Sequence, residues 1–231
     1  MPWPKHGTAD AWEPTDPMRT LTVLALLLTL SAAHADEWWS WANLDVWKQK
    51  PWSGALFLGN RLDTEDGSYV QIASPRVKYQ LLPWLETGVG LSLLNIENTT
   101  THDRHWQGRP EFELNPKFNL TRQLRLDWRN RMEWRKNDGE AFTTSRTRHR
   151  LQLGWTLPQP VGPVTRLFVS NEFLVDLHRH VWGENRLVPL GVTLKLGKQC
   201  DLDLFYMVFS QSGPSNWKHE SVLGTYLRVR F

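Results

Sequence analysis

The strict alternation of polar and apolar residues over Gln123 to Arg135 constrains the fold of this chain more than any other feature. A period of two is the pattern of a β-strand, since successive strand side chains point to opposite faces. The run Arg146 to Leu157 repeats the pattern, so two neighbouring strands share a strongly basic face. A soluble sheet would bury the apolar face and expose the arginines. A transmembrane barrel would instead turn the apolar, Trp-rich face to lipid and line its lumen with the charged face.

The beginning of the chain has the features of an export signal. Residues 1–17 carry no periodicity and are interpreted as an upstream extension outside the fold. Residues 18–35 contain Arg19, an apolar core over Leu21 to Leu30, and Ala33-His34-Ala35 before Asp36, which is the layout of a cleaved signal peptide. The core is about half of the roughly 20 apolar residues that a spanning helix needs. We therefore expect secretion through the inner membrane and a mature chain that begins at Asp36.

The end of the chain carries a second signal. Trp217 to Phe231 alternates to its last residue. A final amphipathic strand that ends in Phe resembles the closing strand of bacterial outer-membrane barrels, which the barrel assembly machinery recognises. Together with the signal peptide, this predicts a Gram-negative outer-membrane protein in contact with lipid and recognised through Phe231.

Short alternating runs separated by turn-rich gaps fill the rest of the chain. The expected strands are Gly54 to Leu62, Tyr69 to Leu81, Leu85 to Leu94, Arg109 to Leu120, Gln123 to Arg135, Arg146 to Leu157, Arg166 to Leu177, Leu187 to Leu196, Leu202 to Gln211 and Ser221 to Phe231. The gaps between them are alternately short and long. The prediction is an all-β, antiparallel transmembrane β-barrel over residues 53–231 with about ten strands, short periplasmic turns and longer outer loops. An even strand count would leave both termini in the periplasm.

Residues 36–52 form a tryptophan-dense segment that alternates only weakly. An eleventh strand there would make the count odd, so we expect a separate periplasmic or lumen-entering segment, with a twelve-stranded arrangement as the alternative. Other tryptophans lie near the ends of the expected strands, where an aromatic girdle would meet the lipid headgroups. The residues expected at this interface are Trp84, Trp106, Trp134, Trp155 and Trp217.

The composition excludes two classes of function. Removal of residues 1–35 takes two of the 27 Lys and Arg and three of the 24 Asp and Glu, which leaves an excess of four positive charges. This mild excess, with arginines at every second position instead of in a block, argues against nucleic-acid binding. Cys200 is the single cysteine, so neither an intrachain disulfide nor a cysteine-built zinc cluster can form.

Several short motifs resemble the uncharacterised bacterial outer-membrane β-barrel family known as domain of unknown function 2490. The motifs are WRNRMEWR, SRTRHRLQLGW, PEFELNPKF, the NEF of Asn171 to Phe173, the ENR of Glu184 to Arg186 and the DLDLFY of Asp201 to Tyr206. The resemblance covers Trp38 to Phe231, and the Trp-rich start departs from the family pattern. It implies a barrel and supplies no activity.

The predicted lumen-facing side chains form a charge network with more cations than anions, nine against six. Its members are Arg109, Glu111, Glu113, Lys117, Arg125, Asp127, Arg129, Arg131, Glu133, Arg135, Arg146, Arg148, Arg150, Glu172 and Asp176. A ten-stranded lumen is narrow, so these groups are expected to pair across it. The first interpretation is a structural network. The second is a narrow, porin-like path or site for a small anionic solute, because arginine rings select anions.

An enzyme is an alternative from a different class. His219 and Ser221 lie two apart on the last strand, similar to the His-x-Ser arrangement of outer-membrane lipid hydrolases, in which His activates a Ser nucleophile. The residues after Ser221 depart from the pattern of those enzymes. His102, Asp103 and His105 are the best metal-ligand cluster, and a solvated loop is the preferred interpretation of it. No cofactor is expected.

Overall fold

The computed structural model describes residues 35–98, 100–141, 143–213 and 215–230. The predicted upstream extension 1–17, the signal peptide up to residue 34 and the terminal Phe231 lie outside these residues. The described strands are β1 (Glu37–Gln49), β2 (Trp52–Asp63), β3 (Gly67–Leu82), β4 (Leu85–Glu97), β5 (Arg104–Asn119), β6 (Leu124–Asn137), β7 (Thr144–Val161), β8 (Val164–Asp176), β9 (Val181–Lys195), β10 (Cys200–Ser212) and β11 (Trp217–Val229). No helix in the described part of the chain is long and apolar enough to cross a membrane, a finding that concerns helices only.

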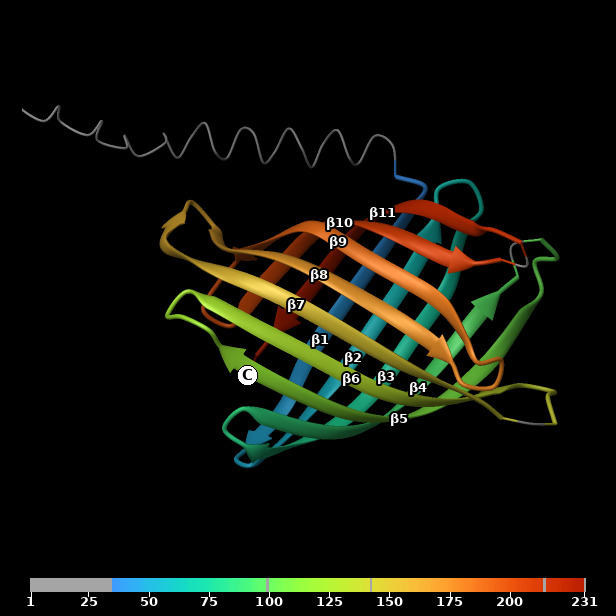
Figure 1. Ribbon diagram of the computed structural model, residues 1–231, viewed down its shortest axis with the longest axis horizontal. Coiled ribbons are helices and arrows are strands. Elements are labelled where there is room, and N and C mark those ends of the chain that lie inside the picture. The colour runs from blue at the N-terminus through green and yellow to red at the C-terminus, as the bar shows by residue number, and fades with distance from the viewer. Residues whose placement is uncertain (1–34, 99, 142, 214, 231) are drawn as a thin grey trace, which may run out of the picture.

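The strands close into one barrel in which neighbours in sequence are neighbours in space (Figure 1). Every pair of consecutive strands is antiparallel, and β1 closes the ring by pairing in parallel with β11. Figure 1 shows the strands strongly tilted, as closure of a sheet requires. The sheet has no free edge, so every strand finds backbone partners on both sides.

The strand count and the strand directions correct the sequence-based expectation. The segment 36–52 was expected outside the barrel, but Glu37–Gln49 is the strand that closes it, which gives eleven strands in the described chain and a mixed sheet. Without β1, the backbone N–H and C=O groups of β2 and β11 that now bond to it would form two open sheet edges. Open edges of this kind have to be paired or shielded. The alternation of β1 is weak because Trp lies on both faces, with Trp38 outward and Trp39 and Trp41 inward.

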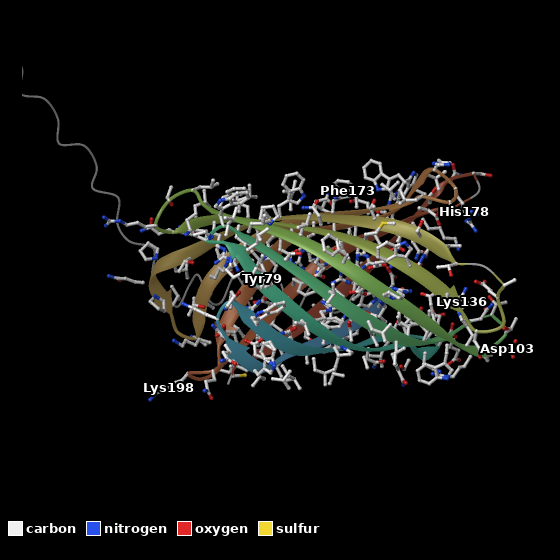
Figure 2. All side chains as sticks on the ribbon, turned by 90° about the horizontal axis from the view of Figure 1, so that it is seen from below. Tyr79, Asp103, Lys136, Phe173, His178 and Lys198 are labelled. Atoms are coloured by element: carbon white, nitrogen blue, oxygen red, sulfur yellow. The ribbon has the colours of Figure 1, made fainter. Side chains whose placement is uncertain are left out.

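An odd strand count also places the two ends of the barrel chain apart. We call the end with the connections 64–66, 98–103, 138–143, 177–180 and 213–216 the loop end, and the end with the connections 50–51, 83–84, 120–123, 162–163 and 196–199 the turn end. Figure 2 shows Asp103, Lys136 and His178 at the loop end and Lys198 at the opposite end.

The loops are shorter than expected because the strands extend further, as β9 does by starting at Val181. Asp36 lies at the loop end, so the expectation of both termini at one end is wrong.

Most tryptophan side chains of the barrel point outward near one of its two ends. The outward and exposed tryptophans are Trp38, Trp106, Trp134, Trp182 and Trp217 toward the loop end and Trp47, Trp52, Trp84, Trp128 and Trp155 toward the turn end. Exposed Leu, Val and Phe side chains such as Val89, Leu91 and Phe112 lie on the strand middles between these two groups. The outer surface is therefore an apolar band with an aromatic border at each end.

Two glycines make room for aromatic rings inside the barrel. A Cβ on Gly191 would collide with the ring of Phe168, and a Cβ on Gly224 would collide with the ring of Phe205. Each ring therefore lies flat against bare backbone of the neighbouring strand. This packing fixes the aromatic side of the interior.

Candidate functional site

Charged side chains from β3 to β9 meet inside the barrel, and Glu133 on β6 is at their centre. The Glu133 carboxylate receives Arg146 Nε at 2.6 Å, Arg148 Nη1 at 2.9 Å and Arg131 Nη1 at 3.5 Å. Glu133 is 0% exposed. Burial of a carboxylate without partners would be very costly, so these three guanidinium groups are what keeps it charged inside the protein.

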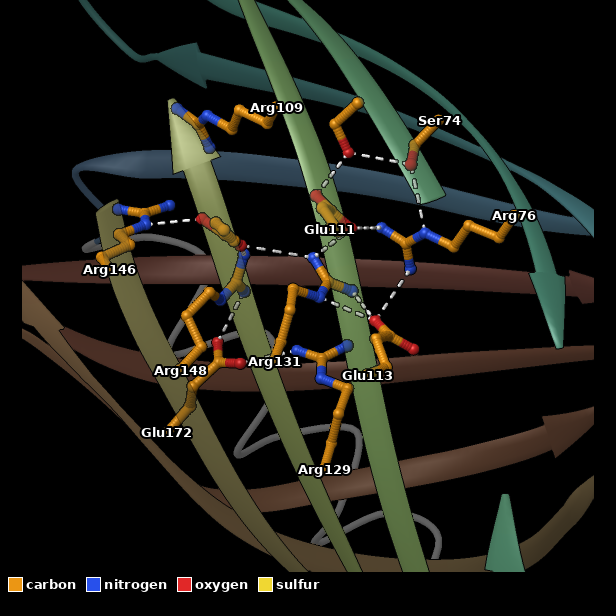
Figure 3. Close-up of polar contacts among 12 residues, drawn as sticks. Ser74, Arg76, Arg109, Glu111, Glu113, Arg129, Arg131, Arg146, Arg148 and Glu172 are labelled. Atoms are coloured by element: carbon orange, nitrogen blue, oxygen red, sulfur yellow. Dashed lines mark hydrogen bonds and ion pairs between the residues drawn. The ribbon is translucent and has the colours of Figure 1, made fainter. Parts of the chain in front are cut away.

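A second group of ion pairs joins β3, β4, β5 and β6. Arg131 lies 3.1 Å from Glu111 Oε2 and donates from Nε to Glu113 at 2.7 Å. Arg76 approaches the same two carboxylates at 3.4 and 3.9 Å. The Ser92 hydroxyl donates to Glu111 at 2.6 Å. Figure 3 shows the carboxylates of β5 held between arginines from both neighbouring sides.

A third group extends the pairing to β8 and β9. Glu172 accepts Arg129 at 2.6 Å and Arg148 at 3.0 Å, and Arg186 lies 3.5 Å away. Arg186 in turn donates to Glu184 at 2.5 Å. We call the whole set the lumen network. Its members are Arg76, Glu111, Glu113, Arg129, Arg131, Glu133, Arg146, Arg148, Glu172, Glu184 and Arg186. With six arginines and five glutamates it is close to neutral, as a buried network must be.

The strands β8 to β11 and β1 carry a cluster of buried apolar side chains. The aromatic wall is formed by Trp39, Phe168, Val188, Phe205, Met207, Phe209 and Val222, with Trp41 and Tyr226 packed against them. Two arginines lie against rings of the aromatic wall. The Arg61 guanidinium lies 3.8 Å from the centroid of the Trp39 ring, and Arg186 lies 5.0 Å from the same ring and 5.4 Å from Phe209. Arg61 lies directly opposite Trp39 on the neighbouring strand β2, whereas Arg186 also pairs with Glu172 and Glu184 and so joins the lumen network to the aromatic wall.

The contact between the two walls fills the middle of the barrel and its loop half. Trp39 and Glu133 are both 0% exposed although they lie on opposite walls, and Phe209, Arg131 and Arg186 are also buried. Side chains that lined an open aqueous channel would touch water. The interior at this level is therefore packed with side chains. We call this packed region, which contains Trp39, Arg131, Glu133, Arg186 and Phe209, the plug.

Below this plug, toward the turn end, the lumen contains a cavity of about 360 Å³. Its lining runs from Arg61, Leu94 and Arg109, at the level of the packed region, past the lumen network to Lys78, Lys117, Arg125 and Arg228 near the turns. One side consists of charged side chains and the other includes rings of the aromatic wall. A second depression at the loop end is lined by Arg135 and Asp176 among other polar residues.

The structure places all fifteen side chains of the predicted charge network on the inner face. Eleven line the cavity, which are Arg109, Glu111, Glu113, Lys117, Arg125, Asp127, Arg129, Arg131, Arg148, Arg150 and Glu172. Glu133 and Arg146 lie in the buried network above it, and Arg135 pairs with Asp176 at 3.1 Å at the loop end. At the turn end, Asp127 is shared by Arg125 at 2.8 Å and Arg166 at 3.3 Å.

Several inner residues escaped the sequence-based prediction. Arg76, Glu184 and Arg186 belong to the network, and Arg61 lies over the ring of Trp39 in the aromatic wall. The strand that places Glu184 and Arg186 on the inner face starts at Val181, whereas the strand expected from the sequence starts only at Leu187. Nothing in the periodicity separates Trp39 from the outward Trp38.

His219 and Ser221, the candidates for a hydrolase pair, lie on the outward face of β11 and contact neighbouring chain segments. A His219 ring nitrogen lies 2.8 Å from the Ser210 hydroxyl of β10. The Ser221 hydroxyl donates to Asp36 at 2.8 Å, and the Ser221 backbone N–H donates to the same carboxylate at 2.7 Å. These hydrogen bonds lower the pKa of Asp36. These contacts join β11 to β10 on one side and to the residue before β1 on the other.

The metal candidate of the sequence lies in the loop between β4 and β5 and at its border. His102 Nδ1 contacts Glu97 at 3.2 Å, and His102 has a positive φ of 59°. Within residues 35–98, 100–141, 143–213 and 215–230, no three His, Cys, Asp or Glu side chains are grouped to hold a metal ion.

The fold resembles one solved structure described as a bacterial polysaccharide outer membrane secretin. The TM-score is 0.50 at 10% sequence identity, and the match covers 75% of this chain and 63% of that chain. This chain thus spans less than two thirds of the length of that protein, and the likeness concerns the fold alone. No curated protein matches the sequence.

A family model described as "Protein of unknown function (DUF2490)" matches residues 37–220. The matched region runs from the first residue of β1 into β11, so it contains the whole lumen network and the lining of the cavity apart from Tyr226 and Arg228. The resemblance seen in the sequence motifs is confirmed, and the chain belongs to the DUF2490 family.

Proposed function

We propose that the protein is a bacterial outer-membrane barrel whose lumen is closed by the lumen network and the aromatic wall. The observation that carries the proposal of a closed lumen is the complete burial of Glu133 and Trp39 on opposite walls. An apolar outer band with tryptophans at both ends is what an outer-membrane barrel needs against lipid, and it supports the membrane location. The predicted signal peptide and the final strand before Phe231 support export and recognition by the barrel assembly machinery.

Fractionation and planar-bilayer recording test the two parts of this proposal. We expect the protein in the outer-membrane fraction, and no steady conductance when the purified protein is inserted into a bilayer. Recovery as a soluble periplasmic monomer without detergent would contradict the membrane location. A stable anion-selective conductance that falls in Arg129→Gln and Arg148→Gln would instead support an anion path, because fixed positive charge raises the local anion concentration.

A variant that removes the plug makes the absence of conductance informative. Trp39→Ala combined with Phe209→Ala deletes two buried rings that meet at 5.0 Å on the aromatic wall. Water should then enter the loop half of the lumen, and small channels should appear. Trp106→Ala with Trp217→Ala removes two outward rings and serves as the matched control that should stay silent. Equal conductance of the wild type and the plug variant would contradict the closed lumen.

A further inference from the structure

The cavity at the turn end carries far more positive than negative charge. Its lining contains thirteen Arg and Lys side chains and six Asp and Glu side chains. When the network members just outside the lining are added, Arg146 against Glu133 and Glu184, the excess is still six positive charges. The near-neutral lumen network does not account for this excess. It arises from Arg61, Arg109 and Arg150, which form no ion pair among the described residues, and from Glu86 and Asp127, each of which is shared by two cations. Unbalanced charge in a confined site favours binding of an anion.

The excess is concentrated where Arg129 on β6 and Arg150 on β7 lie directly opposite each other. Like charges in this position destabilise a sheet. On β8, the residue opposite Arg150 in the strand register is Glu172. Glu172 already pairs with Arg129, Arg148 and Arg186. Among the described residues, the Arg150 guanidinium forms no hydrogen bond or ion pair. It faces the cavity with its donors available.

The other side of the same cavity is aromatic. Trp41, Phe205 and Tyr226 all line it, and the Trp41 ring lies 5.7 Å from the Phe205 ring and 6.3 Å from the Tyr226 ring. Phe168 extends this surface, with its ring 6.4 Å from that of Phe205. A bare inorganic anion would leave these rings without contact. A cavity of about 360 Å³ with an apolar lining and a few charged groups has the size and chemistry of a small-molecule site.

We propose that the turn-end cavity binds an amphipathic organic anion, with its acidic group at Arg150 and Arg129 and a flat apolar body against Trp41, Phe205 and Tyr226. Guanidinium groups bind carboxylate and phosphate oxygens through charge-assisted hydrogen bonds, and aromatic rings stack on planar bodies. Cations at the turn end, including Lys117, Arg125 and Arg228, surround the route to the cavity and attract anions toward it. The inference extends the proposed function, because a plugged lumen makes the cavity a pocket with one open end.

Calorimetry on the purified barrel in lipid nanodiscs tests this site with three probes. The probes are 2-naphthoate, the neutral 2-naphthylmethanol and inorganic phosphate, each corrected for its uptake by empty nanodiscs. We expect 2-naphthoate to bind with a 1:1 stoichiometry and more tightly than either of the other two. Arg150→Gln should weaken 2-naphthoate binding by about tenfold or more, the usual loss for one charge-assisted hydrogen bond.

Three variants separate the binding of 2-naphthoate from folding, from overall charge and from plain anion binding. Arg150→Gln breaks no ion pair, so its thermal unfolding should match that of the wild type. Arg104→Gln removes the same charge at the loop end, outside the cavity, and should bind 2-naphthoate as the wild type does. Phe205→Leu should weaken 2-naphthoate while leaving the weak phosphate binding unchanged.

Each other outcome contradicts the proposal. Equal binding of 2-naphthoate and 2-naphthylmethanol would show partition into an apolar surface. Equal binding of 2-naphthoate and phosphate would show a plain anion site without recognition of the apolar body. No heat above that of empty nanodiscs, or no loss in Arg150→Gln, would show that the cavity is not a site for such anions. These results do not depend on conductance, so failure of this inference and failure of the closed-lumen proposal can be told apart.

Discussion

Glu133 shows at the scale of a single residue how a charge is kept inside this barrel. Three arginines from β6 and β7 approach one fully buried carboxylate, and each of them also reaches a second carboxylate. Arg131 is shared with Glu113, and Arg148 is shared with Glu172. Removal of one carboxylate therefore leaves several buried guanidinium groups with fewer partners at once. The uncompensated cost of burying each of these charges then lowers the stability of the folded barrel.

Glu133→Gln is expected to destabilise the folded barrel by about 3–5 kcal/mol, the typical cost of leaving a buried charge without its partner. Urea titration in lipid vesicles, followed by tryptophan fluorescence, measures the change. Asp127→Asn at the turn end is the matched control, since Asp127 also serves two arginines but is partly exposed. There we expect about 1 kcal/mol or less. Equal losses at the two positions would show that burial does not set the strength of the network.

At the scale of the strands, the sequence predicted what periodicity alone can carry. The charged residues at every second position from Arg125 to Arg135 on β6 and from Arg146 to Arg150 on β7 are predicted to face inward because their alternation is uninterrupted, and the structure has them on the inner face. β1 was missed because Trp38 and Trp39 give its two faces the same chemistry. Its place in the barrel depends on pairing with β11, nearly the whole chain away, and local patterns carry no information about that contact.

Opposite faces of one strand should respond differently to a new charge if the barrel spans a bilayer. Leu153→Arg places a charge on the outer face of β7 and should destabilise the protein by about 2–4 kcal/mol in a bilayer if the site is near the midplane. Gln152→Glu places a charge on the adjacent inner position, in a cavity rich in arginine, and should be tolerated. The two free energies of unfolding in lipid vesicles give the comparison. Similar losses at both sites would contradict the assignment of the faces.

At the scale of the whole molecule, the parallel pair β1–β11 separates the beginning and the end of the barrel. The Asp36 backbone N–H donates to Ser221 O at 2.9 Å, and the Asp36 carbonyl accepts Thr64 N–H at 3.1 Å, both at the loop end. Arg230 N–H donates to Gln199 O at 2.8 Å, at the turn end. Short turns face the periplasm in outer-membrane barrels. The start of β1 should therefore lie on the cell surface.

An epitope tag inserted directly before Asp36, after the predicted signal peptide, tests this topology. We expect antibody to label that tag on intact cells, because Asp36 lies among the loop-end connections. A tag inserted between Gly197 and Lys198, in the turn between β9 and β10, should be labelled only after the outer membrane is permeabilised. A tag between Glu140 and Ala141, in the loop after β6, is the control for surface labelling. If the tags before Asp36 and after Gly197 were accessible from the same side, β1 could not run parallel to β11. The eleven-stranded closure would then give way to an even-stranded barrel in which both ends of the chain lie in the periplasm.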